Sequence, residues 1–446
     1  MHDKLNYIGD YAFYKCDELS TIEFSDNVTN IGEYCFCDCR LLENIKLPRF
    51  LETLKIGALQ NTNICEITIP GSVTEIGSGC FLNCNHLKTV EFEDSDLDLT
   101  LGYGQYNRQP LFIGNPIQRL YLGRNLKEKT MTSNIGYSIS PFMDQTELTN
   151  VTIGNNVKII GPCLFSGCSS LSEINTPNSL EQIGNGAFEG CTNLPIFDNI
   201  QYAGKCAVRV VDKNLDSYNI ANDTKFILSA CFSGCVNLKK IDLPNSIIYW
   251  GDYVFEGCTK LKEITIPDKV ETIAKKMFSG CEELENISIP SNIKIINSDA
   301  FTECDSLEQI IFPATLNLLG QECCSYMPGL KRIYCMASEP PVCEESTLNP
   351  GNSPFGKYNS DFYLRTPNDI PIYVPIGAAE KYRNAWGWDY FTNFIETDDF
   401  PTAIHNVTTE HYDSKNCVYD LMGRKVINPQ KGQVYIKNGK KKLFAY

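Results

Sequence analysis

Cysteine is the residue type of this chain with the widest chemical scope. The sequence holds 21 cysteines among 446 residues, but only 4 histidines. Thiols in such number could build a disulfide scaffold, ligate zinc, or supply a nucleophile beside a base. Each of these uses requires a particular spacing, so the positions of the cysteines decide between them.

Thirteen of the cysteines fall on two positions of a sequence repeat. Zinc sites favour tight Cys-x-x-Cys or Cys/His pairs, and none occurs. Cysteines stacked in a ladder would lie about 4.8 Å apart, but their Cβ vectors would point the same way, which disfavours a disulfide. We therefore predict free thiols that pack as small hydrophobes, with metal and redox roles as the alternatives. The thirteen are Cys16, Cys39, Cys84, Cys168, Cys191, Cys235, Cys258, Cys281 and Cys304 at one position and Cys35, Cys80, Cys231 and Cys323 at the other.

Other catalytic signals are missing from the sequence. His86 follows Cys84 at a place where other copies of the repeat carry polar residues, so we expect it at the surface. No Gly-x-Ser-x-Gly, Walker loop or His-Glu-x-x-His motif occurs. The carboxylates are scattered, and no spacing forces two of them together. We predict a non-enzymatic protein with no cofactor and no metal.

The elements that position the thiols are copies of one unit. Its clearest run spans 250–313, where copies begin at Trp250, Ile273 and Ile296, 23 residues apart (273 − 250 = 296 − 273 = 23). Counting the lead residue as position 0, Phe stands at position 5, Cys at 8, Leu at 11, apolar residues at 14 and 16, and Pro at 17. A fixed period of this length indicates a solenoid. We count about thirteen coils of 22–23 residues.

The spacing within one coil predicts its conformation. Ile264 and Ile266 alternate with polar residues, which predicts a strand with these two side chains inward. Pro267 ends the strand, because proline cannot donate to a ladder. The chain then returns, and a helical turn over 276–281 brings Phe278 inward. The predicted fold is an α/β solenoid of the leucine-rich-repeat type, with a parallel β ladder, short helical or irregular returns, and a core about 60 Å long.

Three stretches depart from the repeat. Polar residues near 93–109 and 124–139 predict loop interruptions. The third, near 198–225, contains an alternating run over 205–211 that predicts the second arm of a hairpin turning at Ala203 and Gly204.

The composition changes after the solenoid, which we assign to 1–335. Residues 336–398 predict a capping unit with a helix over 378–385 and an aromatic plug containing Trp386 and Trp388. Residues 399–446 predict a small β-rich domain.

The repeat pattern Ile-Gly-x-x-Ala-Phe-x-x-Cys-x-x-Leu-x-x-Ile-x-Ile-Pro resembles BspA-like leucine-rich repeats over roughly 8–335. The stretch 198–225 resembles a hairpin insertion common in that family, and the tail from Val418 to Lys440 is similar to terminal domains of secreted Bacteroidota proteins. The resemblance implies an exported or cell-surface, non-enzymatic protein of the host-adhesion type, whose tail serves secretion or anchoring.

Charge and hydropathy exclude some classes of partner. The net charge of −15 disfavours nucleic acid and anionic lipid. The sequence contains no run of eighteen apolar residues, so it predicts no transmembrane helix. No secretory signal precedes the first coil, which begins at Ile8, so we expect that the chain starts inside a longer protein.

The outward strand positions, 13 and 15, are the candidate binding surface. In a solenoid they stack into two columns that an extended partner can follow. We expect a protein or glycoprotein partner, such as a host matrix macromolecule; a structural spacer or a carbohydrate-binding protein is the alternative. Candidate residues are Thr89, Glu91, Glu263, Thr265, Ile311, Arg332 and Tyr334 on the strands and Tyr103 and Tyr106 in the first loop.

Overall fold

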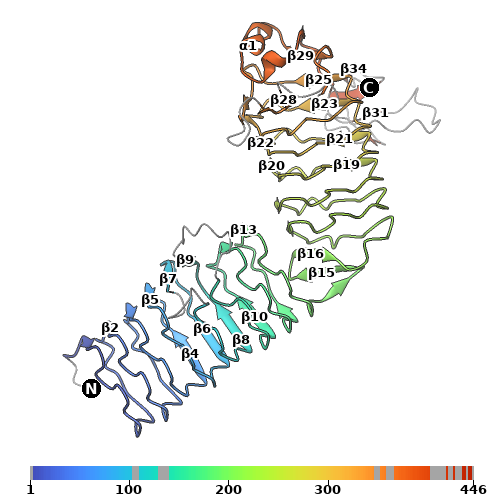
Figure 1. Cartoon of the computed structure of the whole chain (residues 1–446). Helices are drawn as coiled ribbons and strands as arrows, with labels where there is room; N and C mark the ends of the chain where they lie inside the picture. Colours follow the sequence, from blue (N-terminus) through green and yellow to red (C-terminus); the bar gives the residue numbers. More distant parts are fainter. Residues whose placement is uncertain are drawn as a thin grey trace.

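The computed structural model describes residues 4–102, 110–128, 140–345, 352–357 and 366–401, and within 418–443 the backbone of four short strands. Figure 1 shows a rod of stacked coils with one bend, at strands β15 and β16. The predicted solenoid fold is confirmed.

Two parallel ladders run along the rod, where the sequence predicted one. The first ladder is formed by positions 13 to 16 of the coils, and their inward side chains alternate with exposed ones, as predicted. Its strands are β4 (Glu66–Ile69), β6 (Thr89–Phe92), β8 (Arg119–Leu122), β10 (Asn150–Ile153), β12 (Glu173–Ile174), β19 (Glu263–Thr265), β21 (Asn286–Ser288), β23 (Gln309–Phe312), β25 (Arg332–Cys335), β29 (Pro371–Pro375) and β30 (Asn393–Thr397).

The second ladder is formed by short strands, most of which end at the lead residue of a coil. Fifteen such strands occur in the described residues, against thirteen predicted coils; the two additional strands are β16 and β26. The strands are β1 (Tyr7–Ile8), β2 (Asn30–Ile31), β3 (Thr53–Leu54), β5 (Glu75–Ile76), β7 (Leu99–Leu101), β9 (Leu126–Glu128), β11 (Ile159–Ile160), β13 (Gln182–Ile183), β16 (Cys206–Val210), β17 (Phe226–Ile227), β18 (Tyr249–Trp250), β20 (Thr272–Ile273), β22 (Ile295–Ile296), β24 (Leu318–Leu319) and β26 (Val342–Cys343).

The predicted helical turn over 276–281 is wrong. The segment is a run of tight turns in which Lys276 and Gly280 have positive φ angles of 51° and 72°. Its N–H groups alternate between two uses: Cys281 N donates within the coil to Phe278 O, while Phe278 N donates to Ala300 O of the next coil, 2.8 Å away. A helix would direct all of these donors within the segment. The next coil therefore decides the conformation.

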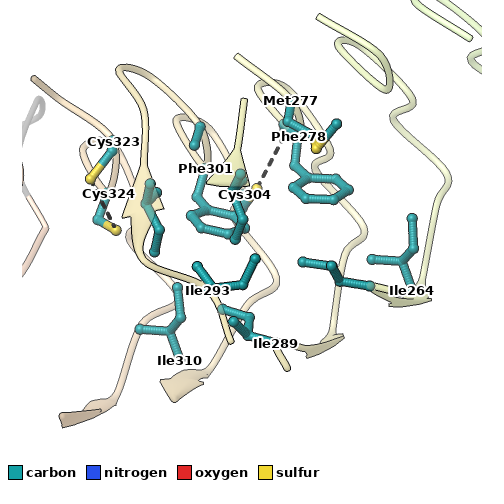
Figure 2. Packing of buried hydrophobic residues seen from close by; sticks show 14 of the residues in the cluster. Ile264, Met277, Phe278, Ile289, Ile293, Phe301, Cys304, Ile310, Cys323 and Cys324 are labelled. Carbon is teal, nitrogen blue, oxygen red and sulfur yellow. Dashed lines mark hydrogen bonds between the residues drawn. The ribbon is translucent and has the colours of Figure 1, made fainter. Parts of the chain in front are cut away.

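The core is a stack of equivalent side chains. The rings of Phe255, Phe278 and Phe301 lie nearly parallel, with centroids 5.7 and 5.6 Å apart. Figure 2 shows Phe278 and Phe301 facing a row of isoleucines that includes Ile289 and Ile293, with Cys304 beside them. Each coil alone would leave these side chains open to water, so burial requires the neighbouring coils.

Two of the predicted interruptions are shorter than the sequence indicated. Strand β7 lies within the stretch 93–109, and Leu101 pairs with Ile76 of β5. Strand β9 lies within 124–139, and Leu126 pairs with Leu99. These strands precede two degenerate coils, in which the repeat pattern is weak: one contains Leu111 and Phe112, and the other contains Phe142. Residues 103–109 and 129–139 lie outside the described residues.

The third departure is the hairpin predicted near 198–225, and it is confirmed. Strand β15 (Ile200–Ala203) pairs antiparallel with β16, turning at Gly204, which has a φ of 59°. β14 (Ile196–Phe197) pairs with the other edge of β15. β16 also pairs in parallel with β17, so the hairpin arm is part of the second ladder.

The hairpin divides the core at the bend. Cys206 and Val208 of β16 pack into the N-terminal core, whereas Ala207 and Val210 pack into the C-terminal core. In Figure 1 the first-ladder strands β4 to β10, β19 and β21 lie on the outer side of this bend, and the second-ladder strands β5 to β13, β20 and β22 lie on the inner side.

The C-terminal end continues the first ladder. β29 pairs with β25, and β30 pairs with β29, all in parallel. The helix predicted over 378–385 is present as α1 (Ala379–Arg383), followed by the 3-10 turn η2 (Trp388–Tyr390). Trp388 is fully buried against Phe312, but Trp386 is 38% exposed, so only one of the two predicted tryptophans plugs the core.

Beyond this end, the described tail strands are β31 (Val418–Tyr419), β32 (Lys425–Val426), β33 (Val434–Lys437) and β34 (Lys440–Leu443). They form an antiparallel sheet in the order β32-β31-β33-β34. Within residues 336–398, a hairpin of β27 (Asn352–Ser353) with β28 (Gly356–Lys357) precedes β29.

Candidate binding surface

The outer face of the first ladder carries the predicted strand residues at their predicted outward positions. At the C-terminal end, Arg332 is exposed, while Ile311 and Tyr334 are half-buried and border solvent. The parallel register places Tyr334 directly beside Ile311. Two of the candidates therefore form one continuous surface with Arg332.

Two residues that the sequence analysis missed extend this surface. Tyr373 of β29 pairs with Tyr334, and Ile395 of β30 pairs with Tyr373. The rings of the two tyrosines stack with centroids 4.6 Å apart and planes 14° from parallel. We call the row Ile311, Tyr334, Tyr373 and Ile395 the aromatic strip. The alternating run at 372–375 is the signal that could have placed Tyr373 on the ladder.

Buried groups hold the aromatic strip from below. Ile372 and Val374 flank Tyr373 and point into the core, where both are fully buried. Beneath them, Trp388 donates from Nε1 to Pro341 O at 3.0 Å, and the Tyr382 hydroxyl donates to Ala337 O at 2.8 Å. Because these side chains are packed and hydrogen-bonded, the strip is carried on a rigid base.

The basic residue beside the strip is also held in place. Arg332 donates from Nε to Gln309 Oε1 of the preceding coil at 2.9 Å. Its side chain lies along the ladder next to Tyr334, two residues further on the same face. An arginine next to tyrosines is a composition enriched where binding energy concentrates.

The N-terminal candidates lie on the same ladder, far along the rod. Glu91 pairs with Tyr121 and Thr89 pairs with Arg119, two residues from a degenerate coil that the sequence analysis did not select. Arg119 donates to Thr89 Oγ1 at 3.3 Å. The Tyr121 hydroxyl donates to Asp94 Oδ1 at 2.9 Å, and desolvation together with this carboxylate raises the pKa of Tyr121. This surface is polar and internally hydrogen-bonded.

In the middle of the rod, the charge of one candidate residue is paired with that of a neighbouring lysine. The Glu263 carboxylate lies 3.3 Å from Lys240 Nζ, while Thr265 is exposed. The structure does not bring this pair together with Thr89 and Glu91, because the hairpin and the bend lie between them. Tyr103 and Tyr106 lie outside the described residues.

The thiols show the packing role predicted for them. Twelve of the thirteen repeat cysteines are buried, Cys16 is half-buried, and all are free thiols. Burial raises the pKa of Cys84 to about 11 and that of Cys168 to about 12, which suppresses the nucleophilic thiolate at neutral pH. Among the described residues, no three His, Cys, Asp or Glu side chains are grouped so that they could hold a metal ion.

Sequence comparison decides the family. The model of the BspA-type leucine-rich repeat region matches residues 1–100, 132–209 and 210–338, in six copies. This chain belongs to the BspA-type leucine-rich repeat family. No curated protein matches it. In the described residues, no helix has the length and apolar character needed to cross a membrane.

Several solved structures resemble this family member. A leucine-rich repeat protein from Bacteroides ovatus is 22% identical, with 89% of this chain and 82% of that chain covered and a TM-score of 0.32. A leucine-rich cell surface protein from Faecalibacterium prausnitzii is 22% identical over 74% and 83% of the two chains, with a TM-score of 0.32. The pneumococcal vaccine antigen PcpA is 16% identical over 85% and 80%, with a TM-score of 0.30. At these identities the likeness concerns the fold alone.

Proposed function

We propose that this protein is a non-enzymatic, secreted or cell-surface protein that binds a host or matrix protein through the outer face of its first ladder. The aromatic strip carries the proposal. It joins partly exposed apolar and aromatic side chains from four successive strands, β23, β25, β29 and β30, with Arg332 alongside.

The chemistry of the strip favours a protein partner. Interface cores are enriched in Tyr and Arg, and a rigid aromatic side chain contributes contact area at little entropic cost. A strip along four strands suits an extended segment or a flat protein surface. The net charge of −15 makes a polyanionic partner unfavourable.

A carbohydrate partner is less well supported. Sugars pack on the open face of an aromatic ring, but Tyr334 and Tyr373 each cover a face of the other at 4.6 Å. A spacer function is the other candidate, and the stacked coils of the rod favour it, because such coils can hold another module at a fixed distance.

The location and the domain division belong to the same proposal. We assign 1–335 to the solenoid, 336–398 to its closing unit and 399–446 to a secretion or anchoring domain. Removal of 402–446 should leave the solenoid intact by circular dichroism but reduce the amount at the cell surface. An unchanged surface amount would refute the role of the tail.

A binding screen tests the function. The full chain would be measured at physiological salt against matrix and plasma glycoproteins and against a glycan array. Tyr334→Ala/Tyr373→Ala and Arg332→Glu should each weaken a protein partner at least ten-fold, since both change the strip or its border. Tyr121→Ala, on the same ladder at the other end, is the matched control and should bind normally.

Each other result has a defined meaning. A partner that is indifferent to the strip variants would place the site elsewhere on the solenoid. Binding to glycans alone would support the carbohydrate alternative. No binding across the panel would favour the spacer.

A further inference from the structure

A second surface feature lies at the bend, away from the aromatic strip. A hollow of about 410 Å³ separates the turn after Ile183 from the turn after Ile227, with the end of β16 at one side. This volume falls within the range of sites that take small molecules or short peptide segments. The proposed function does not use it.

The normal contact between two such turns is a row of hydrogen bonds. In the coil that begins at Ile160, the N–H groups at positions 3, 5 and 7 donate to carbonyls of the next coil at distances of 3.0, 2.9 and 2.7 Å. The coil that begins at Ile227 makes the same three bonds, at 2.8, 3.0 and 2.7 Å. These donors therefore point along the rod toward the following coil.

The coil that begins at Ile183 lacks this row. Its donors are the N–H groups of Gly186, Phe188 and Gly190, and within the described chain none of them bonds to the next coil. The hairpin arm and the segment after it occupy two of the acceptors instead: Val210 N donates to Cys231 O at 3.2 Å, and Lys213 Nζ donates to Ser233 O at 2.6 Å.

Three backbone N–H groups therefore face the hollow, because the hairpin separates them from the carbonyl groups of the next coil. Gly186, Phe188 and Gly190 all line it. Backbone N–H groups at buried or half-buried sites are nearly always hydrogen-bonded. This surface therefore needs a row of hydrogen-bond acceptors from a partner. A single small anion cannot reach donors on three alternating residues, whereas the carbonyls of a peptide backbone repeat along its length.

The side chains around the hollow add a charge preference. Arg209 and Lys213 line it with one carboxylate, Glu189, which leaves one net positive charge in a chain of net charge −15. Arg209 is held by a 2.6 Å bond from its Nε to Gln201 Oε1, and Gln201 is itself buried. Val208 and Leu228 supply apolar walls.

We infer that the hollow at the bend binds a short acidic peptide segment of a protein partner. The carbonyls of that segment accept from Gly186, Phe188 and Gly190, in place of the coil turn that the hairpin displaces. An acidic side chain of the segment pairs with Arg209 and Lys213. The hairpin thus opens a binding edge inside an otherwise closed solenoid.

Hydrogen exchange tests the open donor row first. In the free full-length protein, the amides of Gly186, Phe188 and Gly190 should exchange at least ten-fold faster than the bonded amides at the same positions of the preceding coil, those of Cys163, Phe165 and Gly167. Equal protection would show that the donors already have partners, and it would overturn the inference.

A displayed random heptapeptide library supplies the probe. Selection on the full chain should enrich sequences with Asp or Glu, and the enriched peptide should slow exchange of the amides of Gly186, Phe188 and Gly190 when added. The variant Arg209→Glu/Lys213→Glu should bind this peptide at least ten-fold more weakly. Lys260→Glu/Lys269→Glu makes the same change of charge on exposed lysines elsewhere and should bind it normally.

Three results would refute the site. One is the absence of enriched peptides, and another is a peptide that binds both double variants equally. The third is full displacement of the peptide by citrate at an equal concentration, which would show that the hollow recognises anionic charge without a peptide backbone. Retained circular dichroism of Arg209→Glu/Lys213→Glu would show that weaker binding is not a loss of fold.

Discussion

The Sγ atom of Cys281 lies 3.3 Å from the carbonyl oxygen of Phe255, to which it donates a hydrogen bond across the boundary between two coils. The same contact recurs one coil later, from Cys304 to Phe278 at 3.2 Å. Cysteine at position 8 therefore fills a small buried space and also places its weak donor on a carbonyl of the preceding coil. Thr62, which replaces cysteine in one coil, is buried too and bonds to Leu59 O at 2.8 Å.

This packing predicts the order in which the thiols react. Cys65 is exposed, whereas Cys258, Cys281 and Cys304 are fully buried. Treatment of the native protein with iodoacetamide, followed by peptide mass spectrometry, should modify Cys65 first. The three buried thiols should remain unmodified until the protein unfolds.

The control is the same protein in denaturant, where all four thiols should react at similar rates. Rapid modification of Cys281 in the native state would contradict its buried position.

Alkaline pH should destabilise the solenoid. Burial raises the pKa of Cys84 from 9.0 to about 11 and that of Cys191 to about 12, so the folded state keeps these protons when the unfolded chain loses them. The stabilisation is fully present below pH 9 and is lost as the pH rises toward 11 and 12, by about 1.4 kcal/mol per pH unit for each fully buried thiol. The Tm under reducing conditions should fall steeply above pH 9.

A matched variant separates the thiol contribution from that of other groups. Cys84→Thr copies the residue found at this position in the preceding coil, and it should make the fall in Tm above pH 9 shallower. An identical slope in both proteins would show that Cys84 does not contribute.

The inward phenylalanines should dominate local stability. Phe278 is fully buried between two parallel rings, so Phe278→Ala should cost about 3–5 kcal/mol. Phe278→Leu should cost less, since Leu59 occupies this position in another coil and is fully buried there. Urea unfolding monitored by circular dichroism measures both. Phe50 is 53% exposed, and Phe50→Ala should change stability by less than about 0.5 kcal/mol.

Arg124 should be irreplaceable by lysine. It is fully buried, and its guanidinium donates to Pro70 O at 3.2 Å and twice to Leu97 O, at 3.2 and 3.0 Å. Lysine keeps the charge but lacks the planar group that reaches both carbonyls, so Arg124→Lys should cost about 2–3 kcal/mol. Arg40, whose side chain is 73% exposed, provides the control Arg40→Lys. Equal urea midpoints for the two variants would refute this role.

The local periodicity was sufficient to predict which side chains of a coil point into the core. The inward positions of Ile264, Ile266 and Phe278 follow from alternation and the 23-residue period, because each copy must bury the same face against its neighbours. The hairpin at Gly204 was also readable, since its signals lie within a few adjacent residues. The outward positions of Arg332 and Tyr334 followed from the same alternation.

Only the tertiary structure decided the backbone pairing between coils and the contacts made by segments that interrupt the repeat. The tight turn around Phe278, the second ladder and the strand at Leu101 depend on backbone partners more than 20 residues away, which a local pattern does not specify. The stacking of Tyr373 on Tyr334 and the open donors at Gly186 arise where non-repeat segments meet the solenoid. The sequence by itself determined which side chains of one coil are buried, because burial recurs with the period of the repeat. The neighbouring coils decided the backbone hydrogen bonds, because each coil completes its backbone pairing only with the next coil.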